Sequence, residues 1–161
     1  MSAARIVDRA VAAERAAAWR AAGEKLVLAN GVFDLIHVGH ARYLAGARAL
    51  GDRLMVAVNG DRSTAALKGA GRPVMAATDR AALVAALRVV DLVVVFDEPT
   101  VDGLLEALRP DVHAKGTDYT AEGVPERGTM RRLGGTTAIA GDPKRHASRS
   151  LFERIRGSGG G

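Results

Sequence analysis

The sequence predicts an α/β fold with a parallel sheet of about five strands and helices on both faces. Apolar runs of strand length alternate with helical segments along the chain. The runs are continuous rather than mixed with polar residues, which is typical of strands covered on both sides. The 161 residues are enough for one domain, and they contain no internal repeat or linker, so a single domain is expected.

A helix is expected in residues 1–23, where apolar residues recur every three or four positions before Gly23. Five apolar runs predict strands at residues 25–29, 53–58, 92–96, 111–114 and 136–140. Four further segments predict helices at residues 40–50, 79–88, 99–108 and 150–155. We expect the domain to span residues 1–156, with its core in 25–156, and the glycine-rich residues 157–161 to form a flexible tail.

Composition excludes some classes of protein. The chain has no cysteine, so it has neither a disulfide framework nor a thiolate metal site. No uncharged apolar stretch approaches the roughly 20 residues of a membrane span, and none resembles the core of a signal peptide. We therefore expect a soluble cytoplasmic protein.

The net charge of +5 is concentrated near the C-terminus, where residues 127–156 carry eight Lys or Arg and two acidic residues. Such a surplus suits a small polyphosphate, a nucleic-acid backbone or a solvated surface. One Trp, two Tyr and three Phe leave little material for stacking bases. Nucleic-acid binding is therefore the least favoured of the three.

Polar segments follow the predicted strands, at the carboxyl ends where ligands bind in open parallel sheets. The first strand is followed by GVFD and two histidines, and the later strands by NGDRS, DEPT and KGTDY. We expect these segments to meet at one edge of the sheet.

The two histidines, His37 and His40, lie at the expected start of a helix, where backbone N–H groups and the helix dipole favour an anion. Three residues apart, they share a face, while Gly31 permits a sharp turn and Gly39 removes a side chain between them. Imidazoles donate hydrogen bonds to phosphate and gain charge near neutral pH, so a phosphate site is predicted. A metal site is less favoured, because cysteine is absent and only one acidic residue, Asp34, lies nearby in the sequence.

The string NGVFDLIHVGHARYL resembles the signature of the HxGH nucleotidyltransferases, a cytidylyltransferase-like superfamily. Longer strings, LKGAGRPV and LRPDVHAKGTDYT among them, are similar to the nucleotidyltransferase domain of bacterial ADP-heptose synthase. The resemblance covers residues 25–120 well and the remainder loosely. It implies a Rossmann-like fold and direct transfer of AMP from ATP to a sugar phosphate, D-glycero-D-manno-heptose 1-phosphate, with release of pyrophosphate.

The resemblance also implies roles for individual residues. His37, His40 and Lys68 would be catalytic, with the histidines holding the triphosphate and stabilising its α-phosphate. The implied nucleotide-binding positions are Gly31, Val32, Phe33, Gly39, His40, Lys115, Gly116, Asp118, Ser148, Arg149 and Ser150. The implied substrate-binding positions are Asp34, Asp61, Lys68 and Arg72. Mg²⁺ would accompany the triphosphate, held by phosphates and water rather than by side chains.

Four residues keep alternative roles. Asp34 is better suited to cap the helix start and fix the turn than to act as a base. Asp61 either binds sugar hydroxyls or shapes a turn, and Arg80 either reaches phosphate or lies on the surface. Tyr119 is expected to pack rather than to bind a ligand.

The C-terminal part departs from the family pattern, because RHASRSLFERIR stands where a Ser/Thr cluster usually opens the last helix. Ser150 and Glu153 fit a capping box, which predicts a helix start with Ser148 and Arg149 placed for the β- and γ-phosphates. His146 is unusual at such a site.

The expected partners are ATP, with CTP as the alternative, and a sugar phosphate supplied by a separate sugar kinase. A homodimer is expected from the resemblance. The alternative functions are a cytidylyltransferase for a phospho-alcohol such as glycerol 3-phosphate, and a catalytically silent nucleotide-binding domain, which the altered C-terminal segment favours.

Overall fold

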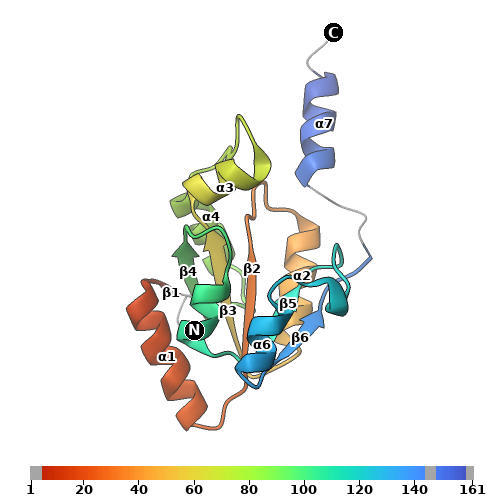
Figure 1. Cartoon of the computed structure of the whole chain (residues 1–161). Coiled ribbons are helices and arrows are strands. Elements are labelled where there is room, and N and C mark those ends of the chain that lie inside the picture. Colours follow the sequence, from red (N-terminus) through yellow and green to blue (C-terminus); the bar gives the residue numbers. More distant parts are fainter. Residues whose placement is uncertain (1–4, 144–147, 159–161) are drawn as a thin grey trace.

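The computed structural model describes residues 5–143 and 148–158. Its strands form one parallel sheet of six in the order β1-β4-β3-β2-β5-β6 (Figure 1). The strands are β1 (Arg5–Val7), β2 (Leu26–Gly31), β3 (Arg53–Asn59), β4 (Leu92–Phe96), β5 (Val112–Lys115) and β6 (Thr136–Ile139). The helices are α1 (Arg9–Ala21), α2 (Val38–Arg48), α3 (Asp61–Lys68), α4 (Ala77–Ala85), α5 (Asp102–Leu108), α6 (Arg127–Arg132) and α7 (Ser148–Ser158), with a 3-10 turn η1 (Ala121–Gly123).

Both faces of the sheet are covered, as predicted. Successive side chains of a strand point to opposite faces, and β3 divides accordingly. Leu54, Val56 and Val58 pack with residues of α2 and α4, whereas Met55 and Ala57 pack with residues of α1, α5 and α6. The predicted α/β fold with a buried parallel sheet is confirmed.

The start of the chain differs from the prediction. Ile6 and Val7 belong to the edge strand β1, which pairs with Val93 and Val94 of β4, and not to a helix. The helix begins after Asp8, whose side chain accepts a hydrogen bond from the backbone N–H of Val11 at 2.8 Å. Pairing with the sheet overrides a local spacing that suits a helix, because three residues gain a ladder of backbone hydrogen bonds.

Two helices were not predicted, and one runs further than expected. Helix α3 occupies the segment taken for a turn and the start of a glycine-rich loop, and α6 lies in the arginine-rich stretch before β6. Helix α7 continues to Ser158, so Gly157 and Ser158 are helical rather than part of a flexible tail. The remaining tail residues, 159–161, lie outside the described part of the chain.

The strand order reverses at β2, which has β3 on one side and β5 on the other. Helix α7 projects beyond this carboxyl end of the sheet (Figure 1) and buries none of its described residues. In the described ranges, no helix is both long enough and apolar enough to cross a membrane.

Candidate active site

A cleft of about 990 Å³ lies at the carboxyl end of the sheet. Its walls come from the ends of β2, β3, β4, β5 and β6 and from the starts of α2 and α7. The predicted site residues that line it are Gly31, Val32, Phe33, Asp34, His37, Gly39, His40, Lys68, Arg72, Lys115, Gly116, Asp118, Ser148 and Arg149. Asp61 and Ser150 are not among the lining residues.

The two histidines lie side by side at the start of α2, with ring centroids 4.0 Å apart. His37 is the N-cap residue, and its Nδ1 accepts a hydrogen bond from the backbone N–H of Gly39 at 3.0 Å. The hydrogen bond is reciprocal, because the Nδ1 of His40 accepts from the backbone N–H of His37 at 3.1 Å. This is a capping box made of imidazoles.

The capping hydrogen bonds fix the tautomer of both imidazole rings. A neutral imidazole whose Nδ1 accepts a hydrogen bond carries its proton on Nε2. His37 and His40 therefore each present an Nε2–H donor from one turn of helix at the cleft. Two neighbouring donors at a helix N-terminus suit the oxygens of a phosphate.

His40 is neutral near pH 7 in the free protein. Burial, and then the charges of His37 and Lys68, lower the pKa of His40 from 6.5 to about 4. The general ability of imidazoles to gain charge near neutral pH therefore does not apply to His40 without a bound anion. The sequence spacing identified the pair but carried no information about its desolvation.

Asp34 does not cap α2, contrary to one half of its prediction, because His37 is the cap; the other half, that Asp34 fixes the turn, agrees with its contacts. Its carboxylate is buried and accepts hydrogen bonds from the backbone N–H groups of Val74 and Met75, at 2.8 and 3.2 Å, and from Nε of Arg72 at 3.1 Å. Asp34 thus ties the loop after α3 to the turn after β2.

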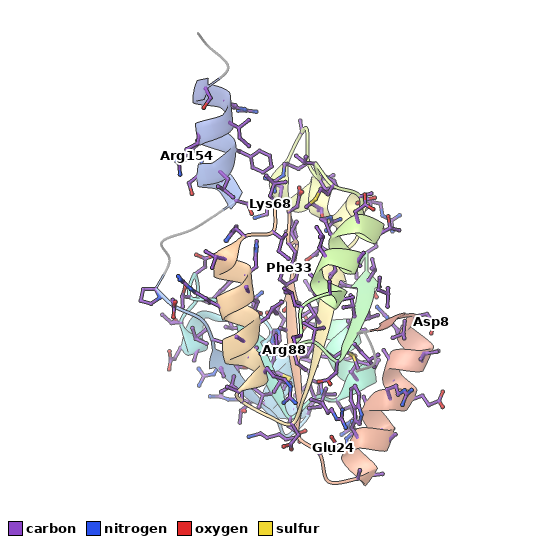
Figure 2. The ribbon with its side chains drawn as sticks, turned by 180° about the vertical axis from the view of Figure 1, so that it is seen from behind. Asp8, Glu24, Phe33, Lys68, Arg88 and Arg154 are labelled. Atoms are coloured by element: carbon purple, nitrogen blue, oxygen red, sulfur yellow. The ribbon has the colours of Figure 1, made fainter. Side chains whose placement is uncertain are left out.

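Lys68 is the last residue of α3, and Gly69 ends the helix with a φ of 90°. That left-handed conformation is open to glycine at no steric cost. Figure 2 shows Lys68 near the end of the molecule from which α7 projects, above Phe33. The contacts of Asp34 hold the loop that directly follows Lys68.

Arg80 fulfils neither of its predicted roles. Its side chain is fully buried, and its guanidinium donates to the carbonyls of Val32 at 2.8 Å and Asn59 at 2.6 Å and to Oδ1 of Asp61 at 2.9 Å. Asp61 also accepts from the backbone N–H of Ala77 at 2.8 Å. Of its two alternatives, Asp61 therefore shapes the junction of α3 and α4 in this structure.

On the β5 side of the cleft, the Nζ of Lys115 lies 4.6 Å from the ring centroid of Tyr119. Burial lowers the pKa of Lys115, while the carboxylates of Glu126 and Asp118 oppose that change. Tyr119 lies against the lysine and also lines the cleft, so its expected role in packing alone stays a prediction.

Helix α7 begins at Ser148, so Ser150 lies inside the first turn and the predicted capping box is wrong. The Oγ of Ser148 donates to the carbonyl of Leu35 at 2.8 Å, and Arg149 forms an ion pair with Glu153 at 3.6 Å. The segment with His146 lies outside the described residues.

The cleft also has lining residues that were not predicted as site residues, and Asn30, Arg42 and Glu126 are among them. Asn30 is the residue before the last in β2, and its Oδ1 lies 2.7 Å from Nε2 of the buried His113. Its position directly before Gly31 was the signal available in the sequence. Glu126 follows a segment with no strand or helix pattern, so nothing local pointed to it.

In the described ranges, no group of three or more His, Cys, Asp or Glu is placed to hold a metal ion. Such a cluster is what a dedicated protein site for a divalent cation requires.

Residues 28–145 match the family described as Cytidylyltransferase-like. The chain belongs to the cytidylyltransferase-like family. Its resemblance to the HxGH nucleotidyltransferases is thereby confirmed, and the histidine pair at the start of α2 is the signature on which that resemblance depended.

Curated relatives of this cytidylyltransferase-like chain include two proteins named bifunctional protein HldE. The one from Methylobacillus flagellatus is 50% identical over 121 residues, which are 75% of this chain and 25% of that protein. The one from Magnetococcus marinus is 44% identical over 151 residues, which are 94% of this chain and 31% of that protein. The chain thus spans about a quarter to a third of the length of these relatives.

Among solved structures, the lipopolysaccharide core biosynthesis protein from Thermoplasma volcanium is similar to this chain. The TM-score is 0.65 and the sequences are 31% identical, with 76% of this chain and 100% of that chain covered. The likeness supports the Rossmann-like description of the sheet.

Proposed function

We propose that the protein is a nucleotidyltransferase that transfers AMP from ATP to D-glycero-D-manno-heptose 1-phosphate and releases pyrophosphate. The observation that carries the proposal is the imidazole capping box, which places two Nε2–H donors at one helix start in the cleft. Family membership and the relatives named HldE support the same reaction class and the heptose acceptor.

The reaction needs no covalent enzyme intermediate. An oxygen of the acceptor's phosphate attacks the α-phosphorus, and the bond from that phosphorus to the bridging oxygen breaks, so that pyrophosphate leaves. Negative charge grows on the oxygens around the α-phosphorus, which becomes five-coordinate. Catalysis therefore depends on positioning and on donors that await this charge.

In this scheme the Nε2–H groups of His37 and His40 donate to the triphosphate and stabilise the α-phosphate. Lys68 supplies positive charge from the end of α3. Ser148 and Arg149, at the start of α7, lie at the same cleft and suit the β- and γ-phosphates. Lys115, Gly116 and Asp118 face the remainder of the nucleotide.

Mg²⁺ would arrive with the triphosphate and neutralise part of its charge. The described residues provide no cluster of three acidic or imidazole ligands, so the phosphates and water would hold the ion. We assign no side chain to it.

The acceptor is a phosphorylated sugar, so a sugar kinase must act before this step. A reaction that consumes ATP and a phosphorylated metabolite belongs in the cytoplasm. We also propose a homodimer, on the family resemblance, which sedimentation equilibrium would test.

Pyrophosphate release tests the function. The purified protein is incubated with ATP or CTP together with heptose 1-phosphate, glycerol 3-phosphate or a hexose 1-phosphate. Release with ATP and heptose 1-phosphate supports the proposal. Release with CTP and glycerol 3-phosphate alone, or nucleotide binding without release against the whole panel, contradicts it.

A further inference from the structure

Glu126 places a buried carboxylate in the wall of the cleft. The residue is 7% exposed and lines the cleft between Pro125 and the start of α6. Its Oε2 has no hydrogen-bond partner among the described residues. A buried carboxylate oxygen without a donor is costly, because it has lost water and gained nothing in exchange.

Capping does not explain this side chain. Glu126 holds the N-cap position of α6, yet its side chain makes no capping hydrogen bond. Two other residues of the described chain, His113 and Thr137, also have a buried side-chain atom without a partner, but neither lines the cleft. Glu126 therefore combines an unsatisfied acceptor with a position in the wall of the cleft.

The missing partner is a neutral hydrogen-bond donor. A carboxylate repels phosphate oxygens, so Glu126 must face an uncharged part of the substrate. The charge of Glu126 acts on Lys115, on the β5 side of the cleft. There the base and ribose of the nucleotide are expected, and not its phosphates. The donors of ATP away from its phosphates are two ribose hydroxyls and one amino group of adenine.

The ribose fits the carboxylate better. The adenine amino group is flanked by two ring nitrogens with lone pairs, which a carboxylate repels, whereas ribose offers two adjacent hydroxyls. An acidic side chain that accepts from a ribose hydroxyl recurs in nucleotide-binding α/β sheets. Asp118 is exposed at the rim, while Glu126 approaches from the buried wall.

We propose that Glu126 accepts a hydrogen bond from a ribose hydroxyl of the bound nucleotide and so selects ribonucleotides over deoxyribonucleotides. This rests on the proposed function, which places a nucleotide in the cleft. A ribose hydroxyl would give the buried carboxylate the donor that it lacks in the free protein. A deoxyribonucleotide without that hydroxyl would leave the carboxylate unsatisfied, and so would bind less tightly.

Binding of analogues tests the assignment. The dissociation constants of ATP, 2′-deoxy-ATP and 3′-deoxy-ATP are measured by calorimetry, without acceptor, for the wild type, Glu126→Gln and Glu122→Gln. Glu122 is the matched control, because it is exposed, lies four residues earlier and does not line the cleft.

We expect Glu126→Gln to weaken ATP binding by about 10-fold, because the neutral amide oxygen of Gln accepts a weaker hydrogen bond than a carboxylate does. For one of the two deoxy analogues, the wild type and Glu126→Gln should bind equally well, because the interaction is already missing. Glu122→Gln should match the wild type with every ligand. Thermal unfolding of free Glu126→Gln should occur near the wild-type temperature, since the buried Oε2 has no hydrogen bond to lose and only the attraction to Lys115 is removed.

Unchanged ATP affinity in Glu126→Gln, or an equal loss with all three ligands, overturns the assignment to ribose. A variant that unfolds or melts well below the wild type also overturns it, because the carboxylate is then structural. These results leave pyrophosphate release by the wild type standing. Absence of any nucleotide binding by the wild type instead refutes the proposed function itself.

Discussion

His37 and His40 each use one ring nitrogen for structure and offer the other for chemistry. The Nδ1 atoms cap α2, and this fixes the tautomer that puts a proton on each Nε2. The same contacts that start the helix therefore orient the donors. Because folding fixes their direction, the donors require little reorganisation when charge develops on a substrate.

The two roles are separable by substitution. Asn at an N-cap and Gln at the third helical position keep capping ability but place no imidazole at the cleft, so His37→Asn and His40→Gln should unfold within about 1 kcal/mol of the wild type. Turnover in the pyrophosphate assay should fall by roughly 100-fold to 1,000-fold in each. Turnover close to that of the wild type in both variants would remove the histidines from the mechanism.

The protonation of His40 should respond to a bound triphosphate. In the free protein, the pKa of His40 is lowered to about 4, first by burial. A triphosphate beside the ring favours the charged form and should raise this pKa. Titration by NMR with and without a non-hydrolysable ATP analogue measures the change. An unchanged or lower pKa in the complex would mean that the anion binds elsewhere.

At the scale of elements, Asp34 joins two segments that are distant in sequence. Its buried carboxylate accepts from Arg72, Val74 and Met75, which lie in the loop between α3 and α4. The guanidinium of Arg72 also lies 4.3 Å from the ring centroid of Phe152 in α7. The loop after Lys68 is thus held on both sides, by the turn after β2 and by the last helix.

Asp34→Asn should destabilise the protein by about 3 kcal/mol, because an amide cannot accept all of these bonds and leaves Arg72 without its charge partner. Limited proteolysis should cut first in residues 69–75. Arg62→Met is the matched control, since Arg62 is 85% exposed and its ion pair with Asp97 is worth little. Equal urea midpoints for Asp34→Asn and the wild type would contradict the role of Asp34.

Element prediction succeeded where the sequence pattern was strong. The central strands and α2 follow continuous apolar runs and an apolar face, and they were predicted close to their observed bounds. Three elements were missed, β1, α3 and α6, and each of them is short. A strand of three residues such as β1 depends on its neighbour β4 more than on its own sequence.

At the scale of the whole molecule, the buried His113 and the half-buried His40 make stability depend on pH. Burial lowers the pKa of His113 to about 3, and that of His40 to about 4. Below pH 6.5 these histidines bind protons in the unfolded chain but stay neutral in the folded chain. The free energy of unfolding should therefore fall as the pH drops from about 6.5 toward these values.

For His113, which is fully buried, the expected loss is about 3 kcal/mol between pH 7.5 and pH 4.5. Urea unfolding at the two pH values measures it. His113→Asn should be less stable at pH 7.5 but should lose about 3 kcal/mol less on acidification. If the variant loses as much as the wild type, His113 is not a source of the acid sensitivity.

The sequence by itself determined the fold class, the succession of the main strands along the chain and the presence of the histidine pair. These follow from local information: apolar runs encode burial, and spacing within one helical turn encodes a shared face. The tertiary structure alone decided the charge state of His40, the structural roles of Asp34 and Arg80, and the placement of Glu126 in the cleft. Each of these depends on desolvation or on partners far along the chain, and no local pattern records either.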